Sequence, residues 1–317
     1  MSKKQKSPEG TGLNRHNNSQ QYVTTASECR PVSAFWDAMQ AVYGRGIPVP
    51  LPDGQIHRFH VPGDAPGNRN GWYVLHLDGI ASGCFGSWKL GTTHKWSSRM
   101  PANLVEAQLI AQRIEHARRR REAELHQRQQ TAIEHARDLL SDSSPADPYH
   151  PYLFAKGCHP HGLRQRGDLL LVLMYHNGQL VNLQRIAPNG SKWFLFGGRV
   201  KGCYALIGHP KTGQPLQICE GWVTGATLYE LTGHAVACAM TANNLLAVGE
   251  HLRQRYPNFE LIIAGDDDRQ IEGNPGRTIA TRASIALDCG LVFPQWPDDA
   301  PLELSDFNDL RQWRTRQ

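Results

Sequence analysis

Acidic residues stand directly after two apolar segments that have the composition of buried β-strands. Glu220 follows Leu216–Cys219, and Asp266-Asp267-Asp268 follows Glu260–Gly265. A third acidic cluster, Asp306-Phe307-Asn308-Asp309, lies further downstream. Ligands of open α/β sheets bind beyond the carboxyl ends of the strands, where these acids are expected. The spacing therefore predicts one carboxylate-rich site built from three distant parts of the chain.

The chemistry of such a site follows from its charge. Alternate residues of an extended segment point the same way, so Asp266 and Asp268 can share one hard cation while Asp267 faces elsewhere. Crowded carboxylates repel one another, but Mg²⁺ supplies compensating charge and binds through one or two of them together with substrate phosphates. We therefore expect metal-dependent phosphoryl transfer. A solvated acidic turn is the alternative that the Gly-Asp-Asp-Asp tract alone would also fit.

The elements that must position these acids alternate between strands and helices. We expect strands at 216–219, 235–239, 260–264 and 291–293, with helices at 224–231, 243–255 and 278–287. This alternation predicts an α/β domain over residues 213–317, with a mostly parallel sheet flanked by helices.

The segment before this domain, residues 149–212, is β-like and strongly basic. Residues 151–215 hold eight basic residues and one acidic residue, whereas residues 216–317 hold eight basic and 14 acidic residues. An apolar strand, a turn at His176–Gln179 and a return strand predict a hairpin. Cations neutralise phosphates and interleaved aromatic residues stack on bases, which suits single-stranded nucleic acid. A solvated β-surface is the alternative.

The N-terminal part is organised differently. Residues 1–28 are polar and expected to be disordered, and residues 29–100 form a small β-rich module with hairpins. Residues 101–148 are rich in Ala, Glu, Gln and Arg, and this composition predicts a helical linker. The fold class is thus α+β N-terminal modules followed by an α/β domain. No apolar run is long enough to span a membrane, and seven scattered cysteines favour reduced thiols in a cytoplasmic protein.

The acidic pattern resembles the TOPRIM domain shared by primases, topoisomerases and some nucleases. The resemblance rests on Glu220-Gly221 after a strand and on Asp266-x-Asp268 about 45 residues later. Upstream motifs narrow it to the catalytic core of bacterial-type primases, in the branch carried by phages, conjugative plasmids and integrating elements. These motifs are Tyr152-Leu153-Phe154-Ala155-Lys156-Gly157, Asn182–Ile186, Gly190–Phe194, Lys201-Gly202, Asn274-Pro275-Gly276 and Asp306–Asp309.

The resemblance implies roles for individual residues. Glu220 would be the acid/base residue, and Asp266 and Asp268 the divalent-metal ligands, with Asp306 and Asp309 as further metal candidates. The expected nucleic-acid or nucleotide contacts are Arg166, Arg185, Lys192, Arg199 and Lys201. This chain departs from the replicative pattern at Trp222-Val223-Thr224, where an acidic residue usually follows, so a second metal position is in doubt.

Bacterial-type primases carry a zinc ribbon before the catalytic core, and residues 29–100 resemble a degenerate version of it. His57 and His60 stand where the first ligand pair would be, and Cys84 opens the second pair, whose last position is Ser87. Structural Zn²⁺ takes four N or S ligands, so we expect a metal-free module in which these three are vestigial zinc ligands.

Together these features predict a DNA primase that makes RNA primers on a single-stranded DNA template from ribonucleoside triphosphates, using Mg²⁺ or Mn²⁺. It would serve the replication of a mobile element, with a separate replicative helicase as a possible partner. Two rivals remain. A TOPRIM nuclease would use the same carboxylates for hydrolysis, and a non-catalytic module would bind single strands without needing them.

Overall fold

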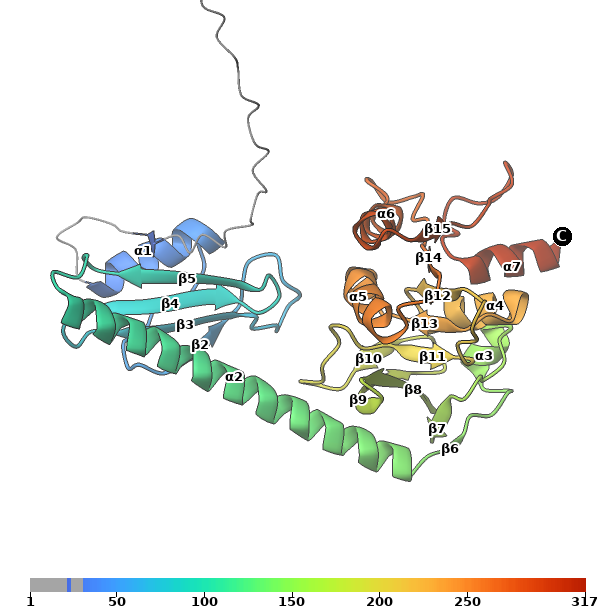
Figure 1. The fold of residues 1–317 in the computed structure, drawn as a ribbon, viewed down its shortest axis with the longest axis horizontal. Helices are drawn as coiled ribbons and strands as arrows, with labels where there is room; N and C mark the ends of the chain where they lie inside the picture. Colours follow the sequence, from blue (N-terminus) through green and yellow to red (C-terminus); the bar gives the residue numbers. More distant parts are fainter. Residues whose placement is uncertain (1–21, 24–30) are drawn as a thin grey trace, which may run out of the picture. The chain divides into compact units, whose positions relative to one another are not determined.

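The computed structural model describes residues 22–23 and 31–317, so most of the predicted disordered tail, residues 1–28, lies outside the described part. The chain divides into two compact units, residues 1–124 and 125–317. The division falls inside the predicted helical linker, which forms one helix, α2 (Leu104–Ser141). Its first half belongs to unit 1 and its second half to unit 2 (Figure 1). No helix in the described residues is long and apolar enough to cross a membrane.

The described residues of unit 1 form a five-stranded sheet with a helix on each face. The strand order is β1 (Tyr22–Val23), β5 (Thr92–Ser97), β4 (Ser82–Ser87), β3 (Gly71–His76), β2 (His57–Phe59). Helix α1 (Pro31–Tyr43), which the sequence reading did not predict, buries Phe35 and Met39 against one face. On the other face, Ala117 of α2 packs with Trp72, Val74 and Cys84.

Unit 2 begins with the basic, antiparallel sheet. Its strand order is β10 (Lys192–Phe194), β9 (Gln179–Ile186), β8 (Leu169–His176), β7 (Arg164–Arg166), β6 (Ser144–Pro145). The predicted β8–β9 hairpin is confirmed. Asn177 and Gly178 both have positive φ, 50° and 77°, as a tight hairpin turn requires. Ala132, Ala136 and Leu139 of α2 pack on one face of this sheet.

The second sheet of unit 2 carries the acids. Its order is β11 (Ala205–Ile207), β13 (Val236–Cys238), β12 (Leu216–Cys219), β14 (Leu261–Ala264), β15 (Gly290–Val292). All pairs are parallel except β11–β13. The predicted α/β class, a mostly parallel sheet flanked by helices, is confirmed. From β12 the chain passes to β13 on one side and then to β14 on the other, so the topological switch point is at β12.

Helices cover both faces of this sheet. Helix α4 (Trp222–Thr232) packs on one face, where α7 (Phe307–Arg316) contacts it. Helices α5 (Leu245–Arg255) and α6 (Pro275–Leu287) pack on the other face. Two short elements complete the unit: α3 (Pro151–Lys156) and a 3₁₀ turn at Ala242–Asn244.

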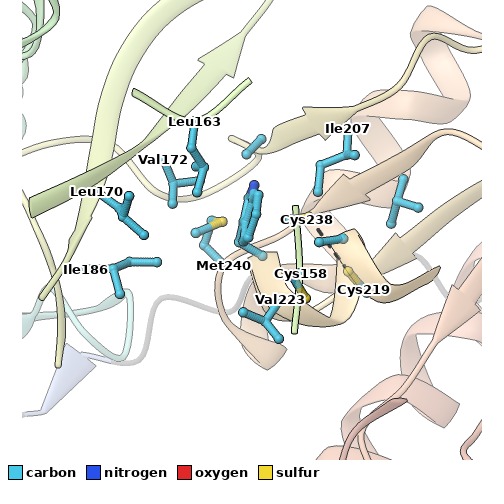
Figure 2. Packing of buried hydrophobic residues seen from close by; sticks show 14 of the residues in the cluster. Cys158, Leu163, Leu170, Val172, Ile186, Ile207, Cys219, Val223, Cys238 and Met240 are labelled. Atoms are coloured by element: carbon cyan, nitrogen blue, oxygen red, sulfur yellow. Dashed lines mark hydrogen bonds between the residues drawn. The ribbon is translucent and has the colours of Figure 1, made fainter. Parts of the chain in front are cut away.

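One hydrophobic core joins the two sheets of unit 2. Figure 2 shows Leu170, Val172 and Ile186 of the basic sheet facing the same interior as Ile207 and Cys238 of the acidic sheet. Helix α4 approaches this core closely because residue 225 is glycine. A Cβ there would stand 2.3 Å from the Cys238 sulfur. The basic and acidic segments therefore fold as one body.

Asn244 ties the segment before α5 to the turn that follows β10. Its side chain is buried. Its amide nitrogen donates to the carbonyls of Val200, Cys203 and Ala239 at 2.8–3.0 Å, and its oxygen accepts the Gly202 N–H at 2.8 Å. Removing this side chain would take away the hydrogen-bond partner of three backbone groups, the Gly202 N–H and the carbonyls of Cys203 and Ala239, whereas Val200 O keeps its bond from the Cys203 N–H.

We expect Asn244→Ala to lower the free energy of unfolding of unit 2 by about 3 kcal/mol, because buried polar groups lose their hydrogen bonds. Urea unfolding followed by circular dichroism measures the change. The matched control is Asn243→Ala, which removes an exposed amide next to it in the chain and should leave stability within about 0.5 kcal/mol of the original. Equal stability of the two variants would contradict the role of Asn244.

Candidate active site at the carboxyl end of the parallel sheet

The register of two central strands brings the first two acidic segments together. Cys219 of β12 pairs with Ala264 of β14. Glu220 therefore leaves its strand beside Gly265, one residue before Asp266. The end of β12 is fixed further by backbone bonds, since Glu220 O accepts the Met240 N–H at 2.7 Å and the Ala242 N–H bonds the Glu220 carboxylate. Strand pairing together with these bonds thus places Glu220 and Asp266 at the switch point.

The side chain of Asp267 points away from those of Asp266 and Asp268, as the alternation along an extended segment predicts. Asp267 is buried and turned away, and its carboxylate accepts hydrogen bonds from Arg277 at 2.8 Å, Asn274 at 2.7 Å and Trp296 at 3.2 Å. The Asp268 carboxylate accepts the Gly276 N–H at 2.8 Å, at the start of α6. Asp266 differs from both because its Oδ1 is buried without any hydrogen-bond partner.

The third acidic segment returns to the site through the connection between β15 and α7. Asp267 N–H donates to Ser305 O at 2.7 Å, which sets Asp306 beside the aspartate triplet. Arg269 holds the same connection through the carbonyl of Leu304, at 3.4 Å, and stacks over Trp296. Asp306 is the N-cap of α7, and its Oδ1 accepts the Asp309 N–H at 2.8 Å.

The electrostatics show that these carboxylates act on one another. The pKa of Asp266 is raised to about 8, first by burial and then by the charges of Asp306, Glu220, Asp268 and Asp309. Burial, with smaller contributions from Asp268 and Asp306, also raises the pKa of Glu220. Burial and the neighbouring Asp309 raise that of Asp306. The structure thus brings together all five carboxylates that the sequence reading selected.

Two lysines from the basic part of unit 2 reach this acidic cluster. Lys156 Nζ lies 3.5 Å from Asp309 Oδ1. Desolvation lowers the pKa of Lys192, while Asp306, Glu220 and Asp266 act in the opposite direction. The Lys192 ammonium also lies 5.5 Å from the ring centre of Tyr152. Lys192 is therefore a neighbour of the acids, as a phosphate contact should be, and Lys156 is a second one.

The donor set suits a hard divalent cation. Its oxygens are carboxylate oxygens, the ligands that Mg²⁺ and Mn²⁺ take. The orphaned Oδ1 of Asp266 and the raised pKa of that group are both relieved by a nearby cation. Glu220, Asp266 and Asp268 are the residues that would hold it. As the side chains stand, no group of three or more potential ligands in the described residues is already arranged around one metal position.

The remaining basic candidates do not gather at the acids. Arg185 stacks over Trp193, with 5.3 Å from its guanidinium to the ring centre, and desolvation lowers its pKa. Arg166 forms an ion pair with Asp142 at 3.2 Å. Arg199 donates from Nε to Lys201 O at 3.0 Å in the turn after β10. Of the five cations that the sequence grouped together, Lys192 thus lies by the acids, Arg199 and Lys201 share one turn, and Arg166 and Arg185 have partners elsewhere on unit 2.

The three vestigial zinc positions do not converge in unit 1. His57 pairs across β2–β3 with Tyr73 and stacks on its ring, on the sheet face that α1 covers. Cys84 lies on the opposite face with Trp72, where burial raises the pKa of its thiol to about 12. His60 Nδ1 bonds the carbonyl of Asn68 at 2.9 Å. Because side chains on opposite faces of a sheet cannot share a metal, His57 and Cys84 form no common site.

Sequence reasoning missed the helix that presents the third acidic segment. Asp306 and Asp309 have the spacing of a capping box, in which an N-cap side chain and a residue three positions later bond the first turn. Asp309 Oδ2 in turn accepts the Ser305 N–H at 3.2 Å. The capping-box spacing could therefore have predicted this helix from the sequence. The pairing of Lys156 with Asp309 could not be predicted in this way, because it joins residues 153 positions apart.

Comparison with known proteins finds relatives among primases. The chain is 33% identical over 287 residues to a DNA primase TraC of Escherichia coli, a match that covers 83% of this chain and 26% of that protein. A second DNA primase TraC of Escherichia coli is 32% identical over 274 residues, covering 82% of this chain and 19% of that protein. The chain therefore spans about a quarter or less of the length of these relatives. No protein-family model matches it.

Among solved structures, a DnaG catalytic core aligns with a TM-score of 0.36 and 13% sequence identity. The alignment covers 56% of this chain and 74% of that one.

The raised pKa of Asp266 predicts a pH-dependent stability. Between about pH 4 and pH 8 the folded state keeps a proton that the unfolded state has released, so the metal-free protein loses stability as pH rises through this range. Asp266→Asn should therefore melt at a higher temperature than the original at pH 8.5, and the difference should shrink toward pH 4.

Differential scanning calorimetry with EDTA measures both variants, and a second scan with Mn²⁺ tests the cation. Mn²⁺ should raise the melting temperature of the original protein and leave that of Asp266→Asn nearly unchanged. Glu272→Gln, which neutralises an exposed acid nearby in the chain, is the control. A lower melting temperature of Asp266→Asn at pH 8.5 would refute the crowding of charge at this site.

Proposed function

Because its homology to the TraC DNA primases extends over 287 residues, we propose that this chain is a primase-like nucleotidyltransferase. It would synthesise RNA primers on single-stranded DNA, in the cytoplasm, for the replication of a mobile element such as a conjugative plasmid. One structural observation supports this proposal most. Glu220, Asp266 and Asp268 gather at the switch point of the sheet, and Lys192 of the basic sheet lies beside them.

The reaction joins the 3′-hydroxyl of one nucleotide to the α-phosphorus of the next and releases pyrophosphate. A divalent cation, Mg²⁺ or Mn²⁺, supplies charge compensation for the incoming triphosphate when it is bound. Glu220 has a raised pKa because it is buried beside other acids, which suits it to accept the proton of the attacking hydroxyl. Lys192, at the start of β10, offers an ammonium group to the phosphates.

Three of the clustered acidic residues already have partners within the protein. Asp267 is neutralised by Arg277 and takes no part, while Asp309 is held by Lys156 and by Ser305. Asp306 bonds the first turn of α7. Glu220, Asp266 and Asp268 are therefore the proposed metal-binding and catalytic set. Asp306 and Asp309 would contribute charge and hold the connection in place.

Primer synthesis is tested with labelled ribonucleoside triphosphates, single-stranded DNA and Mg²⁺ or Mn²⁺. We expect the original protein to make short RNA, and Glu220→Gln, Asp266→Asn and Asp268→Asn each to lose at least about 100-fold in rate. Glu272→Gln removes a negative charge from the surface and should retain full activity.

The same experiment separates the rival functions. Incubation with labelled DNA or RNA and no triphosphates shows cleavage if the carboxylates serve a nuclease. Folded protein that binds Mn²⁺ yet neither polymerises nor cleaves would sink the catalytic proposal. The binding-only alternative then predicts that replacing Asp266 and Asp268 with Asn leaves both nucleic-acid affinity and biological activity unchanged.

A further inference from the structure

Helix α7 buries a polar side chain next to the acids at its start. The five clustered carboxylates, called the carboxylate site below, are those of Glu220, Asp266, Asp268, Asp306 and Asp309. Asn308 stands between the last two in the chain and is 0% exposed. A fully buried amide must find hydrogen-bond partners inside the protein, because it has lost its bonds to water. The partners of Asn308 therefore show which elements it holds together.

The Asn308 side chain joins α7 to two other helices. Its Nδ2 donates to the carbonyl of Lys156, at the end of α3, at 2.8 Å and to Thr227 Oγ1, of α4, at 3.0 Å. The same nitrogen lies 3.4 Å from the sulfur of Cys158. Its Oδ1 accepts from Nε2 of Gln312, one turn further along α7, at 3.2 Å. Three helices from distant parts of the chain therefore meet at this one side chain.

The carbonyl that Asn308 bonds is one of three consecutive carbonyls, those of residues 155–157, at the end of α3. The last carbonyls of a helix have no partner within that helix. Gln312 Nε2 donates to the first of the three at 2.9 Å, Asn308 to the second, and Arg311 Nη2 to the third at 2.7 Å. Side chains of α7 thus cap the carboxyl end of α3.

These contacts fix the acidic segments relative to one another. Helix α4 begins two residues after Glu220, and α7 begins one residue after Asp306. A side chain that bonds both α4 and α7 therefore holds Glu220 and Asp306 at a set separation. Lys156 closes the connection, since its carbonyl accepts from Asn308 while its ammonium pairs with Asp309 at 3.5 Å.

We propose that Asn308 is a positioning residue for the carboxylate site, which holds Asp306 and Asp309 where their charge strengthens the binding of a divalent cation. This inference rests on the proposed function, in which the carboxylate site binds Mg²⁺ or Mn²⁺. Asn308 acts through its neighbours, as groups that orient metal ligands do. A purely structural role would instead lower the stability of the protein and leave the cation affinity of the folded state unchanged.

Titration of the metal-free protein with Mn²⁺, followed by the electron paramagnetic resonance of the free ion, measures the cation affinity. Asn308→Ala should raise the dissociation constant for Mn²⁺ about tenfold, because the first turn of α7 is no longer held against α3 and α4. Thr227→Val keeps the shape of the side chain and removes one acceptor of the amide. It should raise the dissociation constant by a smaller factor, about threefold.

Ser284→Ala is the matched control for lost stability. It removes a different buried hydrogen bond, from Ser284 Oγ to Cys289 O at 2.7 Å, directly before β15 and so at the opposite end of the parallel sheet. Its affinity for Mn²⁺ should equal that of the original protein. Thermal melting with EDTA shows the temperature below which each variant is folded, and all titrations are made below it.

Primer synthesis gives a second readout. A high Mn²⁺ concentration should restore the rate of Asn308→Ala, because its defect is in cation affinity, whereas Asp266→Asn should stay inactive. If Asn308→Ala, or Thr227→Val should the first variant not fold, binds Mn²⁺ as tightly as Ser284→Ala, the proposal is wrong. The expected order of affinities without any primer synthesis would refute the proposed function alone. An original protein that binds no Mn²⁺ would overturn both.

Discussion

The mutual repulsion of five carboxylates is the constraint on which the rest of unit 2 depends. Parallel pairing of β12 with β14 forces Glu220 and Asp266 together, and the connection before α7 adds Asp306 and Asp309. Burial increases the free-energy cost of ionising these carboxyl groups, and the pKa of Asp266 is accordingly raised to about 8. Because this repulsion destabilises the folded state, other interactions around the site must offset it. The hydrogen bonds of Asp267, the cap of α7 and the close packing of α4 on the sheet are interactions of this kind.

The common core of the two sheets determines which cations can reach the acids. Leu170 and Ile186 of the basic sheet and Ile207 and Cys238 of the acidic sheet belong to one buried cluster. Because this core fixes β10 and α3 relative to β12, Lys192 and Lys156 come to the carboxylates without a mobile linker. The formal charge of +5 conceals this arrangement, since a basic segment and an acidic segment nearly cancel.

Much of unit 2 could be predicted from the sequence because its signals are local. Apolar runs bounded by turns gave the strands, and the alternation at Asp266–Asp268 gave the side-chain directions. The connections of Lys156 with Asp309 and with Asn308 depend on packing between distant segments, which no periodicity reveals. Helix α1 was missed because its aromatic and apolar residues, Phe35, Trp36 and Met39, equally suit a short strand.

Unit 1 shows why similar spacing does not guarantee a similar site. The positions of His57 and Cys84 resemble those of zinc ligands, but strand pairing sets them on opposite faces of the sheet. Each face instead has its own stabilising contacts. Phe35 of α1 packs edge-on against Tyr73, Phe85 and Trp96 on one face, and Ala117 of α2 packs with Trp72 and Cys84 on the other. Packing on two faces thus stabilises this small sheet through contacts of its own side chains, and the fold does not depend on a metal shared by His57 and Cys84.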